Sequence, residues 1–182
     1  MLNVHAVAVD NSIYGPGKRT VIWFRGCSIR CKNCINPELW KRDTKCDISI
    51  NDLICKIKNN EVTLLGGEPL DQEDLEQFID ALKENNIGII LFTGYSTKDY
   101  DERKKRIIEK CDVVISEPFI QELKDDSLYL RGSLNQIIAV NSNRYENYNF
   151  SKSSSFEMDI NNNHITSFGR DKNIVNEILE LN

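Results

Sequence analysis

Short runs of apolar, β-branched residues recur along the first 140 residues of the chain. Most are four to six residues long and are bounded by Gly, Pro, Asn or Asp, which is typical of buried strands. We predict strands at Val4–Val9, Thr20–Arg25, Val62–Leu65, Ile87–Phe92, Asp112–Ile115 and Gln136–Val140. Between the first two, Tyr14-Gly15-Pro16-Gly17 predicts a tight turn.

Apolar residues at helical spacing lie between several of these strands. Ser49 is placed to cap a helix over Asn51–Lys58, and Asp71 to cap a helix that ends near Glu84. The second helix has apolar residues at i, i+3, i+4 and i+7, namely Leu75, Phe78, Ile79 and Leu82. Thr97–Lys110 predicts a strongly charged helix, whose charges we interpret as a solvated face rather than a docking surface.

From residue 20 to 140 the chain therefore alternates between strand, loop and helix. Such alternation predicts parallel strands with right-handed helical crossovers. About six strands are too few for a closed eight-stranded barrel, so we expect the α/β class and an open, partial parallel β/α barrel. The unusual residues begin just after strand ends, at Cys27, Gly66 and Thr93, where parallel α/β sheets bind their ligands.

The composition changes after residue 140. Asn141–Ser155 is rich in Asn, Ser and Tyr and predicts a loop, and Phe156–Ile160 with His164–Phe168 predicts a hairpin. Asp171 is placed to cap a last helix. A length of 182 residues favours a single domain over 1–182, with its core at about 12–140 and the small hairpin and helix at 141–182.

Charge and hydropathy exclude some classes of protein. The chain has 23 Lys and Arg against 28 Asp and Glu, a net charge of −5 and a pI near 5.2, which argues against a general nucleic-acid binder. No apolar run approaches the roughly 18 residues of a membrane span, and the first residues do not resemble a signal peptide. We therefore expect a cytoplasmic protein without a membrane or nucleic-acid partner.

Three of the six cysteines, Cys27, Cys31 and Cys34, cluster in the loop after the second strand. Soft thiolates at this density favour an iron–sulfur cluster or zinc. A four-iron cluster normally takes four cysteines, so three would leave one iron open to a substrate. A zinc site remains an alternative, with a histidine, Cys46 or Cys55 as the fourth ligand, although we expect Cys55 to be a small core residue. Buried or redox-active thiols without a metal are the third alternative.

A second signal is Gly66-Gly67-Glu68-Pro69 at the end of a strand. Glycines without a Cβ let the backbone approach a ligand closely, and Glu68 could accept an ammonium group. Alone, this stretch is equally typical of an ordinary loop.

Together, Cys-x3-Cys-x2-Cys after the first barrel strand and Gly-Gly-Glu-Pro after the second resemble the radical S-adenosylmethionine (SAM) superfamily. The resemblance implies that Cys27, Cys31 and Cys34 hold one [4Fe–4S] cluster per chain, whose open iron binds the amino and carboxylate groups of SAM. It also implies that the turn, Gly66, Gly67, Glu68 and Pro69, contacts SAM. One electron from the cluster would cleave SAM to methionine and a 5′-deoxyadenosyl radical.

Further stretches are similar to glycyl-radical-enzyme activating enzymes, and in particular to the anaerobic ribonucleoside-triphosphate reductase activating proteins. They are Gly15-Pro16-Gly17, Phe24-x-Gly26-Cys27, Asn36-Pro37, Phe92-Thr93-Gly94-Tyr95 and Arg131-Gly132-Ser133-x-Asn135-Gln136. This resemblance implies removal of a hydrogen from a glycine Cα of a glycyl radical enzyme, most simply the anaerobic reductase. It also implies a flavodoxin or ferredoxin-type electron donor and no general acid or base.

Asn33 and Ile35 lie beside the cysteines, and Thr93 and Tyr95 follow a strand end, so we expect these four to line the SAM pocket.

Two other functions stay open: a small-molecule radical SAM enzyme similar to 7-carboxy-7-deazaguanine synthase, against which the Arg131–Gln136 stretch argues, and a non-catalytic thiolate metal-binding module.

Overall fold

The computed structural model describes residues 1–151, 157–161 and 164–168, and its main feature is an open seven-stranded sheet. The strand order is β3-β1-β2-β4-β5-β6-β7, and β2, β4, β5 and β6 run parallel. The bounds are β1 Leu2–Asn11, β2 Arg19–Phe24, β3 Asp47–Ile48, β4 Glu61–Gly66, β5 Gly88–Phe92, β6 Val113–Ser116 and β7 Ile137–Val140. The predicted α/β class with a partial, unclosed barrel is confirmed.

The outer strands of the sheet are antiparallel to their neighbours. β1 pairs antiparallel with β2 and β3, and β7 pairs antiparallel with β6. The prediction of parallel strands up to residue 140 is therefore wrong for β7. The connection from β6 to β7 contains a short 3-10 turn, Gln121–Leu123, and no α-helix, so the chain lacks the crossover that a parallel strand requires.

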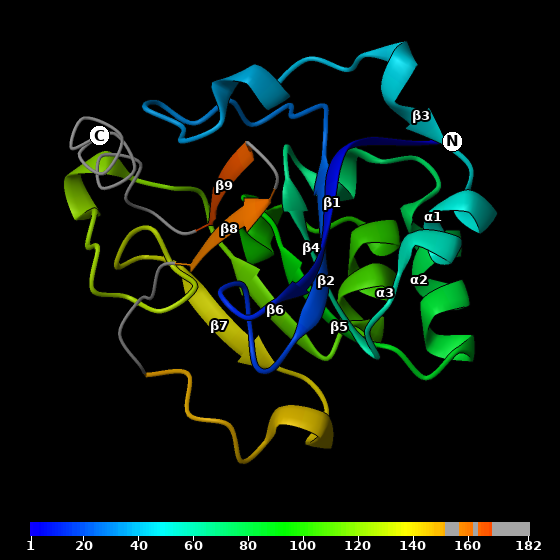
Figure 1. Cartoon of the computed structure of the whole chain (residues 1–182). Coiled ribbons are helices and arrows are strands. Elements are labelled where there is room, and N and C mark those ends of the chain that lie inside the picture. Colours follow the sequence, from blue (N-terminus) through cyan, green and yellow to red (C-terminus); the bar gives the residue numbers. More distant parts are fainter. Residues whose placement is uncertain (152–156, 162–163, 169–182) are drawn as a thin grey trace.

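Three α-helices gather on one side of the sheet (Figure 1): α1 Ile50–Lys56, α2 Leu75–Glu84 and α3 Glu102–Lys110. Ser49 caps α1, as predicted, by accepting a hydrogen bond from the N–H of Asp52 at 3.1 Å. The other two start later than predicted. Pro69–Asp71 and Thr97–Asp99 form separate 3-10 turns, each followed by a residue in extended conformation that breaks the helix.

Both faces of the central strands are covered, which explains their continuous apolar character. Ile89 and Leu91 of β5 point into a core shared with the helices, where Phe78 and Leu82 are fully buried. The alternate residue Ile90 points to the other face. There it packs with a smaller cluster that includes Val113, Ile115 and Tyr145.

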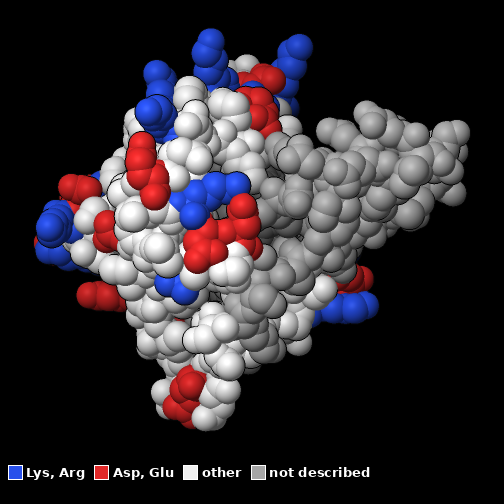
Figure 2. Space-filling view, turned by 90° about the vertical axis from the view of Figure 1, so that its left-hand side faces the viewer, with Lys and Arg blue, Asp and Glu red and all other residues white. Residues whose placement is uncertain are grey.

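The basic residues of α3 have partners within the protein. Arg106 and Lys110 pair with Glu76 of α2, at 2.9 and 3.3 Å. Arg103 donates to the carbonyl of Leu70 at 2.9 Å. Lys and Arg are interspersed with Asp and Glu over the face that Figure 2 shows. Three basic residues of α3 thus bind the helix to its neighbours, whereas Lys104 and Lys105 pair with Asp101 and Glu102 at the start of the same helix.

At the carboxyl-terminal end, β8 Glu157–Asn161 and β9 His164–Phe168 pair as the predicted hairpin. The predicted helix after Asp171 lies outside the described residues. None of the helices in the described ranges has the length and apolar character needed to cross a bilayer.

Candidate functional site

The cysteine loop leaves the sheet directly after β2 and runs over the top of it in Figure 1. Gly26, at a φ of +91°, makes the first bend, and its N–H donates to the carbonyl of Leu39 at 2.8 Å. Arg30 and Asn33 both adopt left-handed backbone conformations, with φ of +49° and +56°. This tight winding lets one short loop present several of its side chains to the same side.

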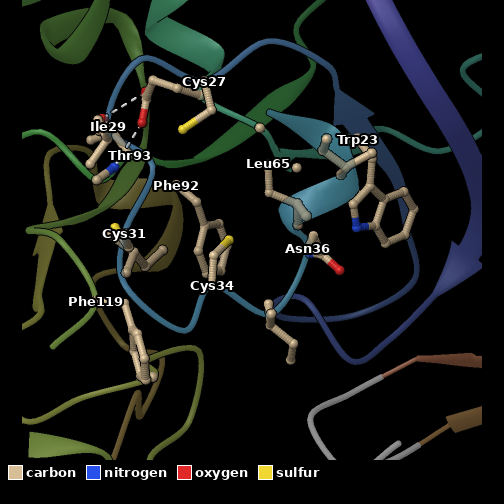
Figure 3. A pocket seen from close by; sticks show the side chains of 18 of the residues that line it. Trp23, Cys27, Ile29, Cys31, Cys34, Asn36, Leu65, Phe92, Thr93 and Phe119 are labelled. Atoms are coloured by element: carbon tan, nitrogen blue, oxygen red, sulfur yellow. Dashed lines mark hydrogen bonds between the residues drawn. The ribbon is translucent and has the colours of Figure 1, made fainter. Parts of the chain in front are cut away.

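Cys27, Cys31 and Cys34 all line one cavity of about 800 Å³, at the edge where the parallel strands end. Figure 3 shows the three side chains on one loop, with the ring of Phe92 from the end of β5 in the same cavity. The volume falls within the range of roughly 300–1,000 Å³ that is typical of small-molecule sites.

The turn after β4 is packed against the start of the cysteine loop. The N–H groups of Gly67 and Glu68 donate to the carbonyls of Phe24 and Gly26, both at 2.8 Å. A Cβ on Gly66 would lie 2.5 Å from the nitrogen of Phe24, and one on Gly67 would lie 2.4 Å from the oxygen of Gly26. Gly66 therefore allows the end of β4 to approach β2, and Gly67 allows the turn to approach the start of the protein's own cysteine loop.

Glu68 is buried, with 1% of its surface exposed, yet it borders the cavity. Its carboxylate accepts hydrogen bonds from the hydroxyl of Thr93 and the N–H of Gly94, both at 2.8 Å, and from the N–H of Leu70 at 3.0 Å. Burial raises the pKa of Glu68 to about 7, and these three donors oppose the rise. One oxygen, Oε2, accepts only from Gly94 among these groups, so it retains capacity for a cation.

The sequence predicted that Asp71 caps α2, and this prediction is wrong, because α2 begins after Asp74. The carboxylate of Asp71 accepts from the N–H of Ser28 at 2.7 Å and from the hydroxyl of Tyr95 at 2.8 Å. Burial and this donation to Asp71 outweigh a hydrogen bond from Ser28 and raise the pKa of Tyr95 to about 12, so Tyr95 remains a donor at neutral pH. Because Ser28 follows Cys27, Asp71 anchors the first residue of the cysteine cluster.

The three thiols form a donor set suited to an iron–sulfur cluster. Burial raises the pKa of Cys27 and Cys31, so both are protonated at neutral pH in the ligand-free protein and must release protons on binding metal. In the part of the chain that the structure describes, no three His, Cys, Asp or Glu side chains are placed to hold a single metal ion. Each cysteine of a four-iron cluster binds a different iron, so its ligands need not converge on one point.

The structure brings most of the predicted pocket residues together. Asn33, Ile35, Gly66, Gly67, Glu68 and Thr93 line the same cavity as the cysteines. Pro69 and Tyr95 are not among its lining residues, and their predicted contact with SAM stays a prediction. Of the remaining cysteines, Cys111 is buried, whereas Cys55 is exposed, so its predicted place in the core is wrong.

Other walls of the cavity were not among the residues predicted to line it. His5 and Trp23 come from β1 and β2, and Phe119 and Tyr129 come from the connection between β6 and β7. His5 is 22 residues from Cys27 along the chain, and only the antiparallel pairing of β1 with β2 brings it to the cavity.

Comparisons with known proteins agree with this site. A family profile described as "4Fe-4S single cluster domain" matches residues 13–139. The anaerobic ribonucleoside-triphosphate reductase-activating protein of Escherichia coli (strain K12) is 30% identical over 150 residues, which cover 75% of this chain and 97% of that protein. Its counterpart from Haemophilus influenzae is 36% identical over 139 residues, covering 69% and 90%. The pyruvate formate-lyase-activating enzyme of Clostridium pasteurianum is 31% identical over 137 residues, covering 69% and 55%.

Proposed function

The chain belongs to the 4Fe-4S single cluster domain family and, within the radical SAM enzymes, to the anaerobic ribonucleoside-triphosphate reductase-activating proteins; from this premise we propose that it cleaves SAM reductively to place a glycyl radical on that reductase. It is accordingly an oxidoreductase-type enzyme with a [4Fe–4S] cluster and SAM as cofactors.

One observation carries the proposal. The three thiols that suit an iron–sulfur cluster and the buried carboxylate of Glu68 border the same cavity, at the edge where four parallel strands end. A cluster held by three cysteines has one iron without a protein ligand, and Glu68 offers a negative group for the ammonium of a ligand bound there.

In this mechanism the chain binds, orients and shields the reactants. Cys27, Cys31 and Cys34 would hold the cluster, and the carboxylate of Glu68 would bind the amino group of SAM. The apolar side chains of Ile35 and Phe92 border the cavity and limit the access of water to it. When bound, the cluster would supply the electron for the reductive cleavage of SAM, which in turn would be the source of the radical that removes the glycine hydrogen.

The partner's glycine must reach this radical from outside. The sheet is open, and β7 and β3 form its two ends in the described part of the chain, so a flexible loop of the reductase can approach the cavity without passing through a closed barrel. We propose a flavodoxin or ferredoxin-type protein as the electron donor. No side chain is required as a general acid or base, because the chemistry is a hydrogen-atom transfer.

The test is anaerobic reconstitution followed by two product measurements. We expect about four iron and four sulfide per chain, 5′-deoxyadenosine from SAM and dithionite, and a glycyl radical signal in electron paramagnetic resonance (EPR) only when the reductase is added. A bound zinc ion in place of iron would contradict the proposal. Formation of 5′-deoxyadenosine with no radical on the reductase would redirect it to a small-molecule substrate.

The chain provides a matched control for the ligands. Replacing any one of Cys27, Cys31 and Cys34 with serine should reduce the iron content severely and abolish 5′-deoxyadenosine formation. Cys55→Ser, at an exposed position on α1 that does not line the cavity, should leave both unchanged.

A further inference from the structure

The segment that carries the cysteines is basic, although the protein as a whole is acidic. Residues 25–46 contain six Lys and Arg against two Asp and Glu, a net charge of +4. The other residues contain 17 basic and 26 acidic side chains, a net charge of −9. Lys and Arg side chains project from the upper end of the molecule in Figure 2, the end over which this segment runs in Figure 1. The proposed function makes no use of this charge.

Most of these cations have no partner within the part of the chain that the structure describes. Four exposed residues form neither an ion pair nor a side-chain hydrogen bond with another described residue, and we refer to them as the loop basic surface: Arg30, Lys32, Lys41 and Lys45. By contrast, four cations of α3 pair with carboxylates. Unpaired charges of one sign on one segment create a positive potential that attracts acidic partners.

Hydrogen bonds bring the two arms of this segment together. The N–H of Cys27 donates to the carbonyl of Trp40 at 3.1 Å, and Nε of Arg25 donates to the carbonyl of Lys41 at 3.2 Å. The residues that follow Trp40 therefore lie beside the start of the cysteine loop. The cations of both arms thus belong to one end of the molecule.

The loop basic surface lies outside the cavity. Successive residues of the cysteine loop alternate, since Ile29, Cys31 and Asn33 line the cavity, whereas Arg30 and Lys32 do not. The other two members of the loop basic surface are not lining residues either. A protein bound to this surface would lie next to a cluster ligand and would leave the cavity free for SAM and for the glycine of the reductase.

Electron transfer is the step that needs a partner at this place. Its rate falls steeply with distance, and Cys31 lies between two of the exposed cations, Arg30 and Lys32. Electron-transfer proteins associate through small, weak interfaces, where attraction between opposite charges mainly raises the association rate. The reductase, in contrast, must place its glycine inside the cavity, from which these cations are absent.

We propose that the loop basic surface is where the electron donor docks, and that this donor is a protein with an acidic face around its redox cofactor. This inference rests on the proposed function. In the docked complex the reduced cofactor of the donor loses one electron and the cluster gains it, and no bond forms or breaks.

The experiment compares Lys32→Glu with Lys18→Glu in reconstituted protein, with an acidic flavodoxin, photoreduced before mixing, as the probe. Lys18 is also exposed and unpaired among the described residues, but it lies at the opposite end of β2 from the cysteine loop. In stopped-flow absorbance at low salt, the flavodoxin should reduce the cluster of Lys32→Glu roughly fivefold more slowly than that of the wild type. Lys18→Glu should match the wild type.

Salt and a binding measurement separate docking from other effects. The difference between Lys32→Glu and the wild type should disappear toward about 1 M salt, where the Debye length falls to about 3 Å. Binding of flavodoxin to the cluster-free protein, followed by calorimetry, should weaken in Lys32→Glu and not in Lys18→Glu. Excess dithionite needs no docking surface and should reduce all variants alike.

The double variant Lys41→Glu/Lys45→Glu carries the test should Lys32→Glu lose iron, because neither residue is adjacent to a proposed ligand. Reduction by flavodoxin at the wild-type rate in the variants would overturn the inference, as would a wild-type cluster that flavodoxin does not reduce. Variants that accept electrons normally but no longer bind the reductase would assign this surface to the reductase instead. A wild-type protein that binds cluster but forms no 5′-deoxyadenosine with dithionite would overturn the proposed function.

Discussion

The hydroxyl of Thr93 donates a 2.8 Å hydrogen bond to Oε1 of Glu68, across the gap between the turns that follow β5 and β4. Both residues are buried. This contact joins two neighbouring strand ends at the cavity, and it places a carboxylate where the ionised form is costly unless a donor faces it.

The ionisation of Glu68 should appear in the pH dependence of stability. Burial raises the pKa of Glu68 from 4.5 to about 7 in the folded protein. The folded state therefore binds the proton more tightly than the unfolded state, and this group's contribution to the unfolding free energy is complete below pH 4.5. It is lost as the pH rises through about 7, by at most about 3 kcal/mol.

Urea denaturation of the ligand-free protein at several pH values between 5 and 8 measures this effect. Glu68→Gln cannot ionise, so its unfolding free energy should lack the decline that the wild type shows over this range. Parallel pH profiles of the two proteins would show that Glu68 titrates normally and would contradict the expected shift.

Thr93→Val should destabilise the protein in a manner that depends on pH. It removes one of the three donors to Glu68 and leaves the N–H of Tyr95, which donates to the Thr93 hydroxyl at 3.1 Å, without that acceptor. We expect a loss of about 1–3 kcal/mol, larger at pH 8 than at pH 5 because the ionised carboxylate needs the donor more. SAM binding, followed by calorimetry, should weaken as well.

Thr63→Val is the matched control. Thr63 is a buried threonine in β4 whose hydroxyl donates to the carbonyl of Tyr14 at 2.7 Å, a neutral partner. Its loss should cost about 1 kcal/mol at every pH and leave SAM binding unchanged. If the stability loss has the same pH dependence in both variants, the Thr93 hydroxyl does not stabilise the ionised form of Glu68, and the prediction is wrong.

The turn after β4 should tolerate no side chain at Gly66. This residue has a φ of +113°, and an added Cβ would meet the backbone of Phe24 within 2.5–2.7 Å, where no flexible side chain can move aside. We expect Gly66→Ala to lower the unfolding free energy by about 3 kcal/mol or more. Gly17→Ala, at a φ of +66° with open space around it, should cost only about 1 kcal/mol. A similar loss in both variants would mean that backbone strain alone, and not the contact with β2, explains Gly66.

The sequence sufficed to locate the chemistry because parallel strands end at one edge. Cys27, Gly66 and Thr93 each follow a strand that periodicity predicts, so their meeting at one cavity follows from the topology. Helix α1 and its Ser49 cap were predictable for a similar reason, because caps and apolar spacing are local signals.

Contacts between a side chain and a distant backbone were not predictable. Asp71 has the sequence context of a helix cap, but its carboxylate binds Ser28, 43 residues away, and no periodic pattern marks such a pair. Gln136 has the sequence context of an ordinary turn residue, and its contact with Glu117 depends on β7 returning antiparallel to β6. The strand direction was wrong in the prediction, and every contact that depends on it was therefore missed.

A substitution at the opposite end of the sheet should lower the unfolding free energy without lowering the iron content of the reconstituted protein. Arg19, at the start of β2, is fully buried, and its Nη2 donates to the hydroxyl of Tyr145 at 3.0 Å and lies 3.4 Å from Glu61. The hydroxyl of Tyr145 in turn donates to Glu61. Tyr145→Phe removes one hydrogen bond from the buried charge of Arg19 and one from the carboxylate of Glu61, so we expect a loss of about 1–3 kcal/mol in denaturant unfolding.

Tyr148→Phe is the control for this change, because its hydroxyl lies 3.3 Å from that of Tyr129, a neutral group. It should cost less than Tyr145→Phe, since a hydrogen bond to a charged group stabilises more than one between neutral groups. Iron content after reconstitution should equal that of the wild type in both variants, because β2 separates Arg19 from the cysteine loop by its whole length. Loss of iron in Tyr145→Phe at temperatures where it remains folded would show that the two ends of the sheet are coupled, and the independence argued from the strand geometry would be wrong.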